Sequence, residues 1–362
     1  MRRKLLVSVL SSVLVLCLVA CGASTPEPEP SPEVKEEVSE KQEADVVEPE
    51  VTEPEKKETE ATSDEPETAD ETEQASEKSE EESSASEEVV FEGPENKNIQ
   101  FYEVPEGTTV IGYGAFCGCQ NLTEVVLPDS IKEIGGYSFG QCLLLPSINI
   151  PEGCEKIGAS AFTDCIELRS IELPQSIKVI ENGAFHGSGF SVYLEKAKLP
   201  DELDRLGENA FGGCRYLTEI NIPVVEEIER ECFRGTSLKK VDIPEGVKTI
   251  GDSAFRAGSG GTITELSLPG TLENIGEYAF AGQQNITELT IPQSTTSIGD
   301  NAFSGCKELT ITVPETTTQI GEQAFADCKK VIIPRSVLNT LYMKEDGFER
   351  EYAGGALIEV IE

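Results

Sequence analysis

Phenylalanine returns at a nearly fixed interval along most of this chain. Ten of the 14 phenylalanines are separated by 22 to 26 residues, namely Phe116, Phe139, Phe162, Phe185, Phe211, Phe233, Phe255, Phe280, Phe303 and Phe325. A period in the low twenties is typical of a solenoid, in which each repeat forms one coil. Because one coil cannot bury its own apolar face, the period predicts a rod of stacked coils with a continuous core.

Each repeat contains a short apolar strand. In the repeat that begins at Phe116, Val125 and Leu127 are two residues apart, which is the spacing of one face of a strand. Pro128 follows and ends the strand, because proline has no N–H to donate to a ladder. Neighbouring strands of such a stack pair in parallel, so ten to eleven repeats predict a sheet about 45–50 Å long.

The other half of each repeat predicts a single helical turn. In the segment 299–305, Asp300 suits the start of a helix and Gly305 suits a left-handed residue at its end. Asp164 and Asp327 occupy the place of that glycine in two other repeats, and aspartate tolerates a positive φ better than most residues.

The repeated pattern I-G-x-x-A-F-x-G-C-x-x-L-x-x-[IV]-x-[IL]-P resembles the BspA-type leucine-rich repeat of bacterial surface proteins, and it covers about residues 99 to 334. The resemblance implies an α/β leucine-rich-repeat solenoid over residues 96–334, with a parallel sheet on the concave face and short helical turns on the other side. Ile180–Glu181 and Ile228–Glu229 lack the glycine of the pattern. Three extra residues around Phe190–Leu199 put regular curvature there in doubt.

The first 20 residues read as an export signal. Three basic residues at positions 2–4 precede an apolar run, Leu5–Val19, that is short for a membrane-spanning helix. The run ends in Leu-Val-Ala-Cys-Gly, which resembles the bacterial lipoprotein cleavage box. This resemblance implies cleavage before Cys21, a diacylglycerol on its sulfur, and an exported protein anchored in the cell membrane and facing outward. An ordinary signal peptide or an uncleaved anchor is the alternative.

Residues 21–95 follow as a predicted disordered linker. Between Gly22 and Glu95 the chain carries 28 acidic residues against 5 lysines, with many prolines and no aromatic residue before Phe91. Such a segment buries too little apolar surface to offset the entropy of ordering it, and its charge extends it. A stalk that lifts the solenoid from the membrane is the simplest role; capture of cations by its carboxylates is the alternative.

The formal net charge of the whole chain is −38. An acidic surface excludes nucleic acid and anionic membrane surfaces as expected partners. After Pro334 the repeat stops, and residues 335–362 combine a helical spacing with a terminal apolar strand. This segment is expected to cap the open apolar end of the last repeat.

The cysteines and the single histidine suggest structure rather than chemistry. Six of the 11 cysteines hold one repeat position, three residues after the phenylalanine, as a small buried residue would: Cys119, Cys142, Cys165, Cys214, Cys306 and Cys328. We expect free thiols, although stacked neighbours lie within disulfide range. No C-x-x-C pair, phosphate-binding loop or nucleophile elbow is present, and His186 lies at an exposed repeat position. We therefore expect no catalytic residue, no metal and no cofactor.

The outward face of the sheet is the remaining candidate site. It is formed by strand residues that alternate with the buried ones, and it is polar with a basic interruption near its middle. Its candidate interaction residues are Glu124, Arg169, Glu172, Lys196, Lys198, Glu219, Lys239, Lys240, Glu265 and Glu288. The face is either merely solvated or a contact surface of modest affinity around its lysines.

Two functions remain open from the sequence. The resemblance implies a non-enzymatic surface protein that displays the rod for adhesion to a host or extracellular-matrix protein, or to another envelope protein. The alternative is a cell-envelope structural or carbohydrate-binding accessory lipoprotein. Sugar binding predicts aromatic platforms on the sheet, and few aromatic residues are expected there, which favours a protein partner.

Overall fold

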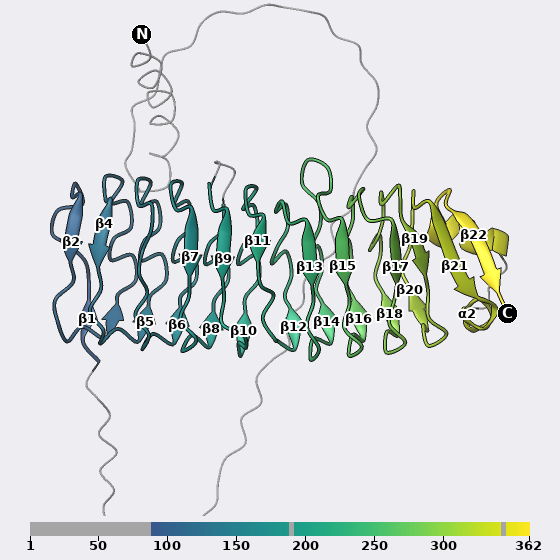
Figure 1. Ribbon diagram of the computed structural model, residues 1–362, viewed down its shortest axis with the longest axis horizontal. Helices are drawn as coiled ribbons and strands as arrows, with labels where there is room; N and C mark the ends of the chain where they lie inside the picture. Colours follow the sequence, from purple (N-terminus) through teal and green to yellow (C-terminus); the bar gives the residue numbers. More distant parts are fainter. Residues whose placement is uncertain (1–87, 188–191, 342–344) are drawn as a thin grey trace, which may run out of the picture. The chain divides into compact units, whose positions relative to one another are not determined.

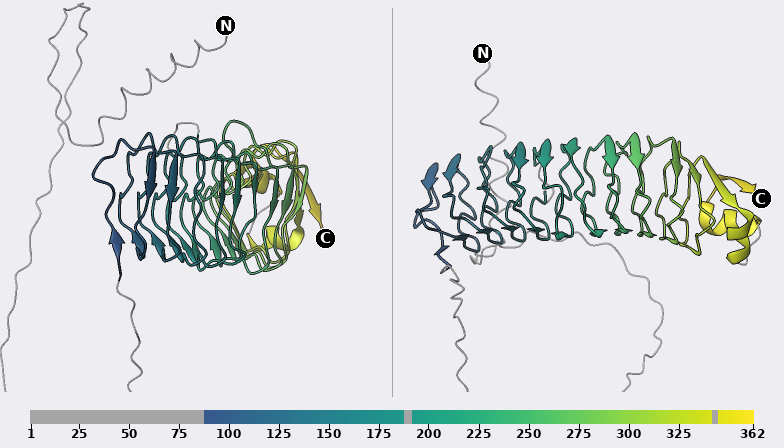
Figure 2. Two further views of the ribbon diagram at one scale, coloured as in Figure 1. Left: turned by 60° about the vertical axis from the view of Figure 1, so that its left-hand side comes forward. Right: turned by 60° about the horizontal axis from the view of Figure 1, so that its bottom comes forward.

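The computed structural model describes residues 88–187, 192–341 and 345–362, and the predicted signal segment and Cys21 lie outside these ranges. The described residues form a stack of coils, each returning to the same place one repeat later (Figure 1). We name each coil by its phenylalanine, and each coil begins just after the Ile–Gly step that precedes this residue. Two rows of parallel strands, which we call the short ladder and the long ladder, run along the stack (Figures 1 and 2).

The short ladder consists of two-residue strands that contain the isoleucine of the Ile–Gly step. It is divided into a six-stranded and a five-stranded sheet. The first sheet contains β1 (Val90–Phe91), β3 (Val110–Ile111), β5 (Glu133–Ile134), β6 (Lys156–Ile157), β8 (Val179–Ile180) and β10 (Arg205–Leu206). The second contains β12 (Glu227–Ile228), β14 (Thr249–Ile250), β16 (Asn274–Ile275), β18 (Ser297–Ile298) and β20 (Gln319–Ile320).

The long ladder contains the strands predicted from the sequence, and it is divided into four sheets. These are β2 (Phe101–Glu103) with β4 (Glu124–Val126); β7 (Ser170–Glu172), β9 (Lys196–Lys198) and β11 (Glu219–Ile220); β13 (Lys240–Asp242) with β15 (Glu265–Ser267); and β17 (Glu288–Thr290), β19 (Thr310–Thr312), β21 (Lys330–Pro334) and β22 (Leu357–Ile361). Between β4 and β7 the coil has no strand, and there Pro146 lacks the N–H that a ladder requires.

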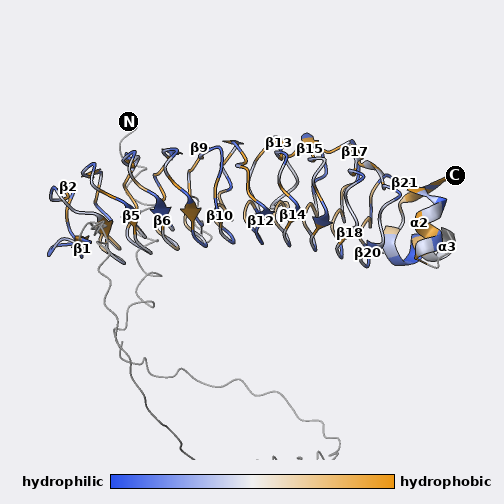
Figure 3. Cartoon of the chain, turned by 90° about the horizontal axis from the view of Figure 1, so that it is seen from below, coloured by the Kyte–Doolittle hydropathy of each residue, from blue (hydrophilic) through white to orange (hydrophobic). Residues whose placement is uncertain are grey.

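The phenylalanines form a third row, the phenylalanine column, inside the stack. All ten rings of the repeat are at most 1% exposed, and successive rings stack nearly parallel with centroids 5.0–6.1 Å apart. The backbone N–H of each phenylalanine donates to a carbonyl of the next coil, as from Phe139 to Ala161 at 2.8 Å. The predicted file of stacked core residues is therefore confirmed, and apolar residues alternate with polar ones along each coil (Figure 3).

The segment around each phenylalanine is not the helical turn that the sequence predicted. Two residues before Phe303, Asn301 has a φ of 55°, and two residues after it, Gly305 has a φ of 74°. The left-handed residues predicted at Gly305, Asp164 and Asp327 are confirmed, the last two with φ of 55° and 60°. The earlier left-handed residue was not predicted, and it prevents a right-handed helix from forming because the backbone reverses its handedness within the turn.

The stack begins earlier than the sequence boundary at residue 96. β1 pairs in parallel with β3, and the ring of Phe91 lies 5.4 Å from that of Phe116. Val90 and Phe91, which were assigned to the linker, therefore belong to the first coil. They were missed because their repeat lacks the Ile–Gly and Ala–Phe steps of the pattern.

Residues 335–361 form the last coil. Helices α2 (Arg335–Thr340), α3 (Glu345–Phe348) and the π-helix η2 (Glu349–Ala353) lead to β22, which pairs with β21 over five residues. The ring of Phe348 is fully buried and lies 6.3 Å from that of Phe325. Within the described residues, helices are found only in this coil, so the solenoid has little helix.

Candidate functional site

Eight of the ten candidate interaction residues lie in strands of the long ladder, and the exposed residues Arg169 and Lys239 lie one residue before β7 and β13. In β4, β7, β9, β13 and β17 the first and third side chains are exposed while the middle one is buried. The middle residues Ile171, Ala197 and Val241 belong to the core. The alternation follows from the pleat, which points successive side chains to opposite faces. Exposed positions therefore form columns that cross the coils.

The lysines of the basic interruption are paired with carboxylates. Lys196 lies 2.6 Å from Glu219 on the next strand, and Lys198 pairs with Glu172 on the preceding strand. Hydrogen bonds to these glutamates raise the pKa of both lysines, so both remain charged at neutral pH. Because the four side chains are more than 60% exposed, the pairs add little to stability.

A group of aromatic side chains beside these pairs was missed by the sequence analysis. The rings of Tyr193 and Tyr216 lie 5.1 Å apart at 39°, and the guanidinium of Arg169 lies 4.7 Å from the ring centroid of Tyr193. Arg169 also contacts Glu167 at 3.2 Å and Glu195 at 3.3 Å. We call Arg169, Tyr193 and Tyr216 the tyrosine cluster. Such a group has the composition of a protein-binding hot spot.

The extra residues of the Phe185 coil explain why the cluster was missed. Counted from Phe185, Tyr193 is out of register with the equivalent residues of the other coils. The backbone N–H of Tyr193 nevertheless donates to the carbonyl of Ile166 at 3.0 Å, which restores the alignment with the preceding coil. Tyr216 then follows one coil later and is 44% exposed. The signal available in the sequence was the pair of tyrosines just before consecutive strands.

The other candidate residues lie apart from this centre. Lys240 bonds Asp242 on its own strand at 3.0 Å and faces Glu265 across the ladder. Glu124 faces Phe101 near one end of the stack, and Glu288 faces Thr310 toward the other. The structure therefore brings together Arg169, Glu172, Lys196, Lys198 and Glu219, while Glu124, Lys239, Lys240, Glu265 and Glu288 extend the same face along the rod.

Outside this face, the described ranges offer little evidence of a metal-binding or catalytic site. No group of three histidine, cysteine or acidic side chains there is placed to hold a metal ion. The ring Nδ1 of His186 lies 2.9 Å from the carbonyl oxygen of Gly212, and its ring is partly buried rather than fully exposed. No helix in the described part of the chain has the length and apolar content needed to cross a bilayer.

The cysteines of the repeat position three residues after the phenylalanine, which we call the cysteine column, are part of the core. Eight cysteines are buried as free thiols: Cys119, Cys142, Cys154, Cys165, Cys214, Cys232, Cys306 and Cys328. Within the column, Cys165 donates to the carbonyl of Phe139 at 3.1 Å and Cys214 to that of Phe185 at 3.1 Å. Burial raises the pKa of each of these two thiols to about 12, so neither forms a nucleophilic thiolate near neutral pH.

Comparison with solved structures finds leucine-rich-repeat proteins from bacteria. The chain is 23% identical to a leucine-rich repeat protein from Bacteroides ovatus, covering 74% of this chain and 85% of that one, with a TM-score of 0.37. It is 21% identical to the pneumococcal vaccine antigen PcpA, covering 76% and 83%, with a TM-score of 0.41. A leucine rich cell surface protein from Faecalibacterium prausnitzii is 21% identical, covering 73% and 88%, with a TM-score of 0.32.

The match to a protein family is more direct evidence than the likeness to these solved structures. A comparison with curated proteins finds no match. The family described as the BspA type leucine rich repeat region matches six copies, over residues 89–192, 190–310 and 258–340. These ranges include nearly all the described coils. Leucine-rich repeats generally act as protein-binding scaffolds rather than catalysts. The chain belongs to the BspA-type leucine-rich-repeat family.

Proposed function

We propose that this protein is a non-enzymatic surface protein whose long-ladder face binds another protein. The tyrosine cluster is the observation that carries the proposal. Tyrosine and arginine dominate the binding energy of protein interfaces. Here they lie one to three residues before the strands β7, β9 and β11. Around them lie exposed ion pairs that a partner with both charges can replace without burying an unpaired charge.

The partner class is an extracellular protein. The N-terminal 20 residues support export, and Cys21 supports a lipid anchor in the cell membrane with the solenoid facing outward. The acidic linker then acts as a spacer between anchor and rod. A host or extracellular-matrix protein fits the role of an adhesin, and another envelope protein is the second partner of the same class.

The test is binding of the purified chain to immobilised matrix proteins and, separately, to cell-wall glycans. Tyr216→Ala is expected to weaken protein binding by about 30-fold, the effect of losing one hot-spot side chain. The matched control is Tyr113→Ala. Tyr113 is 75% exposed and lies 5.9 Å from Tyr137 in another exposed tyrosine pair, away from the long ladder. Equal loss in both variants, or no effect of Tyr216→Ala, contradicts the proposed face.

Carbohydrate binding is the second candidate function, and the tyrosine cluster also bears on it. Aromatic residues do occur beside the sheet, contrary to the expectation from the sequence, so the absence of platforms no longer argues against sugars. However, Arg169 covers one face of Tyr193, and Tyr216 is inclined to it by 39°. Two rings in that arrangement do not form a flat platform. If the purified chain is retained on glycans and not on matrix proteins, the partner is a carbohydrate rather than a protein.

The anchor has a separate test. Cells that express the chain are labelled with palmitate, and wild type is compared with Cys21→Ala. Incorporation of label that depends on Cys21 supports the lipid anchor. Equal labelling, or none in either protein, rejects it and favours an ordinary signal peptide or an uncleaved anchor.

A further inference from the structure

The short ladder is interrupted once in the described residues, and the sequence shows why. Six residue steps separate proline from the isoleucine of the next Ile–Gly step in a regular coil, as from Pro244 to Ile250. In the Phe211 coil only five steps separate Pro223 from Ile228. This coil is therefore one residue too short at the turn that leads into β12.

The missing residue changes the hydrogen bonding on both sides of the turn. In regular coils a tight turn closes after the proline, as where Ile177 donates to Pro174 at 3.1 Å. Before the interruption, Leu203 donates instead to Val224 of the next coil at 3.1 Å. A single bridge between Glu202 and Val224 replaces the strand pairing, and β10 and β12 become edges of separate sheets.

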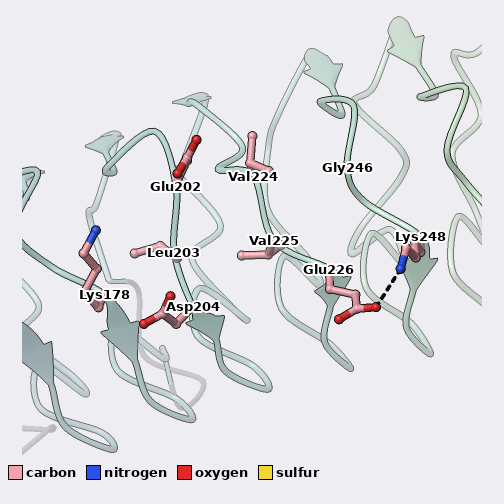
Figure 4. Close-up of a pocket in the computed structure, with 9 residues that line it drawn as sticks. All are labelled: Lys178, Glu202, Leu203, Asp204, Val224, Val225, Glu226, Gly246 and Lys248. Carbon is pink, nitrogen blue, oxygen red and sulfur yellow. Dashed lines mark hydrogen bonds and ion pairs between the residues drawn. The ribbon is translucent and has the colours of Figure 1, made fainter.

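An open hollow of about 340 Å³ lies over the interruption and is lined by residues of four successive coils. Leu203 and Val225 lie at its centre, with Asp204 on one wall and the ion pair of Glu226 with Lys248 on the other (Figure 4). In the intact part of the ladder adjacent strands are paired directly, as β14 is with β16.

The side chain of Arg205 spans the interruption. Its guanidinium lies 2.8 Å from Glu181 on the preceding coil and 2.8 Å from Glu229 on the following coil. A second nitrogen donates to Glu229 at 3.2 Å, so this pair is bidentate. Glu229 stands where the repeat has glycine, and its carboxylate also accepts the backbone N–H of Glu208 at 3.0 Å. Side chains thus replace the missing backbone contacts.

The opposite side of the same interface remains bonded. In the long ladder β9 pairs with β11, and Phe185 donates to Ala210 at 2.8 Å in the phenylalanine column. The Phe185 and Phe211 rings are 5.0 Å apart there. On the next interface the long ladder opens instead, between β11 and β13, and the Phe211 and Phe233 rings are 5.8 Å apart, wider than any earlier step of the column. The Phe211 coil is therefore paired with the preceding coil only through its long-ladder strand, and with the following coil only through its short-ladder strand.

We propose that the Phe211 coil is a joint at which the solenoid bends by opening its short-ladder side, and that Arg205 is the latch that holds the joint closed. The phenylalanine column and the long ladder form the axis of the bend. The coils before β10 and after β12 move as two stiff bodies, because their short-ladder pairing is continuous on each side.

Hydrogen exchange of the full chain tests the joint. Amides of residues 224–230 are expected to exchange faster than those of residues 246–252, which lie one coil later in the intact ladder. Arg205→Gln is expected to accelerate exchange in 224–230 by about tenfold, because opening then breaks no bidentate ion pair. Insertion of one glycine after Val224 restores six steps to Ile228 and is expected to slow exchange there to the value of the intact ladder.

Lys156→Gln is the matched control. Lys156 occupies the same strand position as Arg205 and also contacts carboxylates on both adjacent coils, Glu133 at 3.1 Å and Glu181 at 3.7 Å. Its ladder is intact, so the variant is expected to leave exchange at 155–158 unchanged. If Arg205→Gln does not fold, hydrogen exchange of the wild type is measured in 1 M salt instead. Exchange is then expected to accelerate at 224–230 and not at 155–158. Equal protection of 224–230 and 246–252 in the wild type, or equal effects of both variants, overturns the joint.

The bend itself is measured by spin labels. Labels at Lys132→Cys and Glu273→Cys lie on opposite sides of the joint, and labels at Lys132→Cys and Lys178→Cys lie on one side; Cys117 is replaced by serine in both. A broad distance distribution for the first pair, narrowed by the glycine insertion, and a narrow one for the second are expected. Equally narrow distributions overturn the proposal.

Discussion

The backbone N–H of Phe116 donates to the carbonyl oxygen of Ser138 in the next coil, at 2.6 Å. In most other coils an alanine provides this carbonyl, as Ala161 and Ala184 do. Ser138 is fully buried, and its Oγ has no hydrogen-bond partner. A buried hydroxyl without a partner thus occupies a position that is alanine in most other coils.

Ser138→Ala is expected to stabilise the protein. Removing an unsatisfied buried hydroxyl recovers its desolvation cost, so the free energy of unfolding should rise by about 1 kcal/mol. Urea denaturation of the full chain measures the change. Thr295→Val is the control: this buried hydroxyl donates to Leu272 at 2.9 Å, so its removal should lower stability. A loss of stability in Ser138→Ala contradicts the assignment.

Glycine in the Ile–Gly step is expected to be required by the closeness of the coils. A Cβ on Gly299 would lie 2.6 Å from the backbone N of Glu277. Gly299→Ala should therefore cost about 3 kcal/mol, because the clash is with backbone that cannot rotate away. Gly107 has a φ of +85° but open space around it, and Gly107→Ala should cost about 1 kcal/mol for its backbone conformation alone. Chemical denaturation that ranks the two in reverse would refute this reading.

The phenylalanine column is expected to carry a large share of stability. Phe211 is fully buried, and Phe211→Ala should lower the free energy of unfolding by about 3–5 kcal/mol through lost burial and a cavity. Phe101 is 52% exposed, and Phe101→Ala should change stability by less than about 1 kcal/mol. Thermal or urea unfolding distinguishes them, and similar losses would show that Phe211 is not a core residue.

Buried thiols are expected to make the protein less stable at alkaline pH. Burial raises the pKa of Cys154 to about 11 and that of Cys214 to about 12. A thiol in the unfolded chain titrates near pH 8.5, so its native-state advantage is complete below that pH. As pH rises toward 11 and 12 the unfolded state loses protons that the native state retains, and stability falls.

Cys214→Ala should therefore reduce the alkaline slope of the free energy of unfolding between about pH 9 and 12. Leu217→Ala, a neighbouring buried residue without a thiol, should lower stability by the same amount at each pH. The measurement is a series of urea titrations across this range. An unchanged slope in Cys214→Ala would mean that its thiol is not protected in the native state.

The strands of the long ladder and the core columns were predictable from local pattern. Val125 and Leu127 are followed by Pro128, and this order repeats so often that strand, face and end are all specified by neighbouring residues. The turns were not predictable in the same way. The left-handed conformation of Asn301 is favoured because alternate backbone N–H groups of this turn donate to carbonyls of the next coil. Those carbonyls are more than 20 residues away in the sequence.

The candidate face shows the same division. Exposure of Lys196 and Lys198 follows from alternation along one strand, and the sequence predicted it. Their pairing with Glu219 and Glu172, and the meeting of Arg169 with Tyr193, depend on the register between coils. The longer Phe185 coil shifts that register, so only the folded stack determines which side chains become neighbours.

The sequence by itself determined the architecture of this protein, because a repeat that cannot bury its own apolar face must stack on copies of itself. The tertiary structure decided where that stack is imperfect. One missing residue after Pro223 carries no signal in a single repeat, yet it separates β10 from β12 and leaves Arg205 to join them. The physical reason is that inter-coil hydrogen bonds depend on the lengths of two adjacent coils together, whereas burial depends on each coil alone.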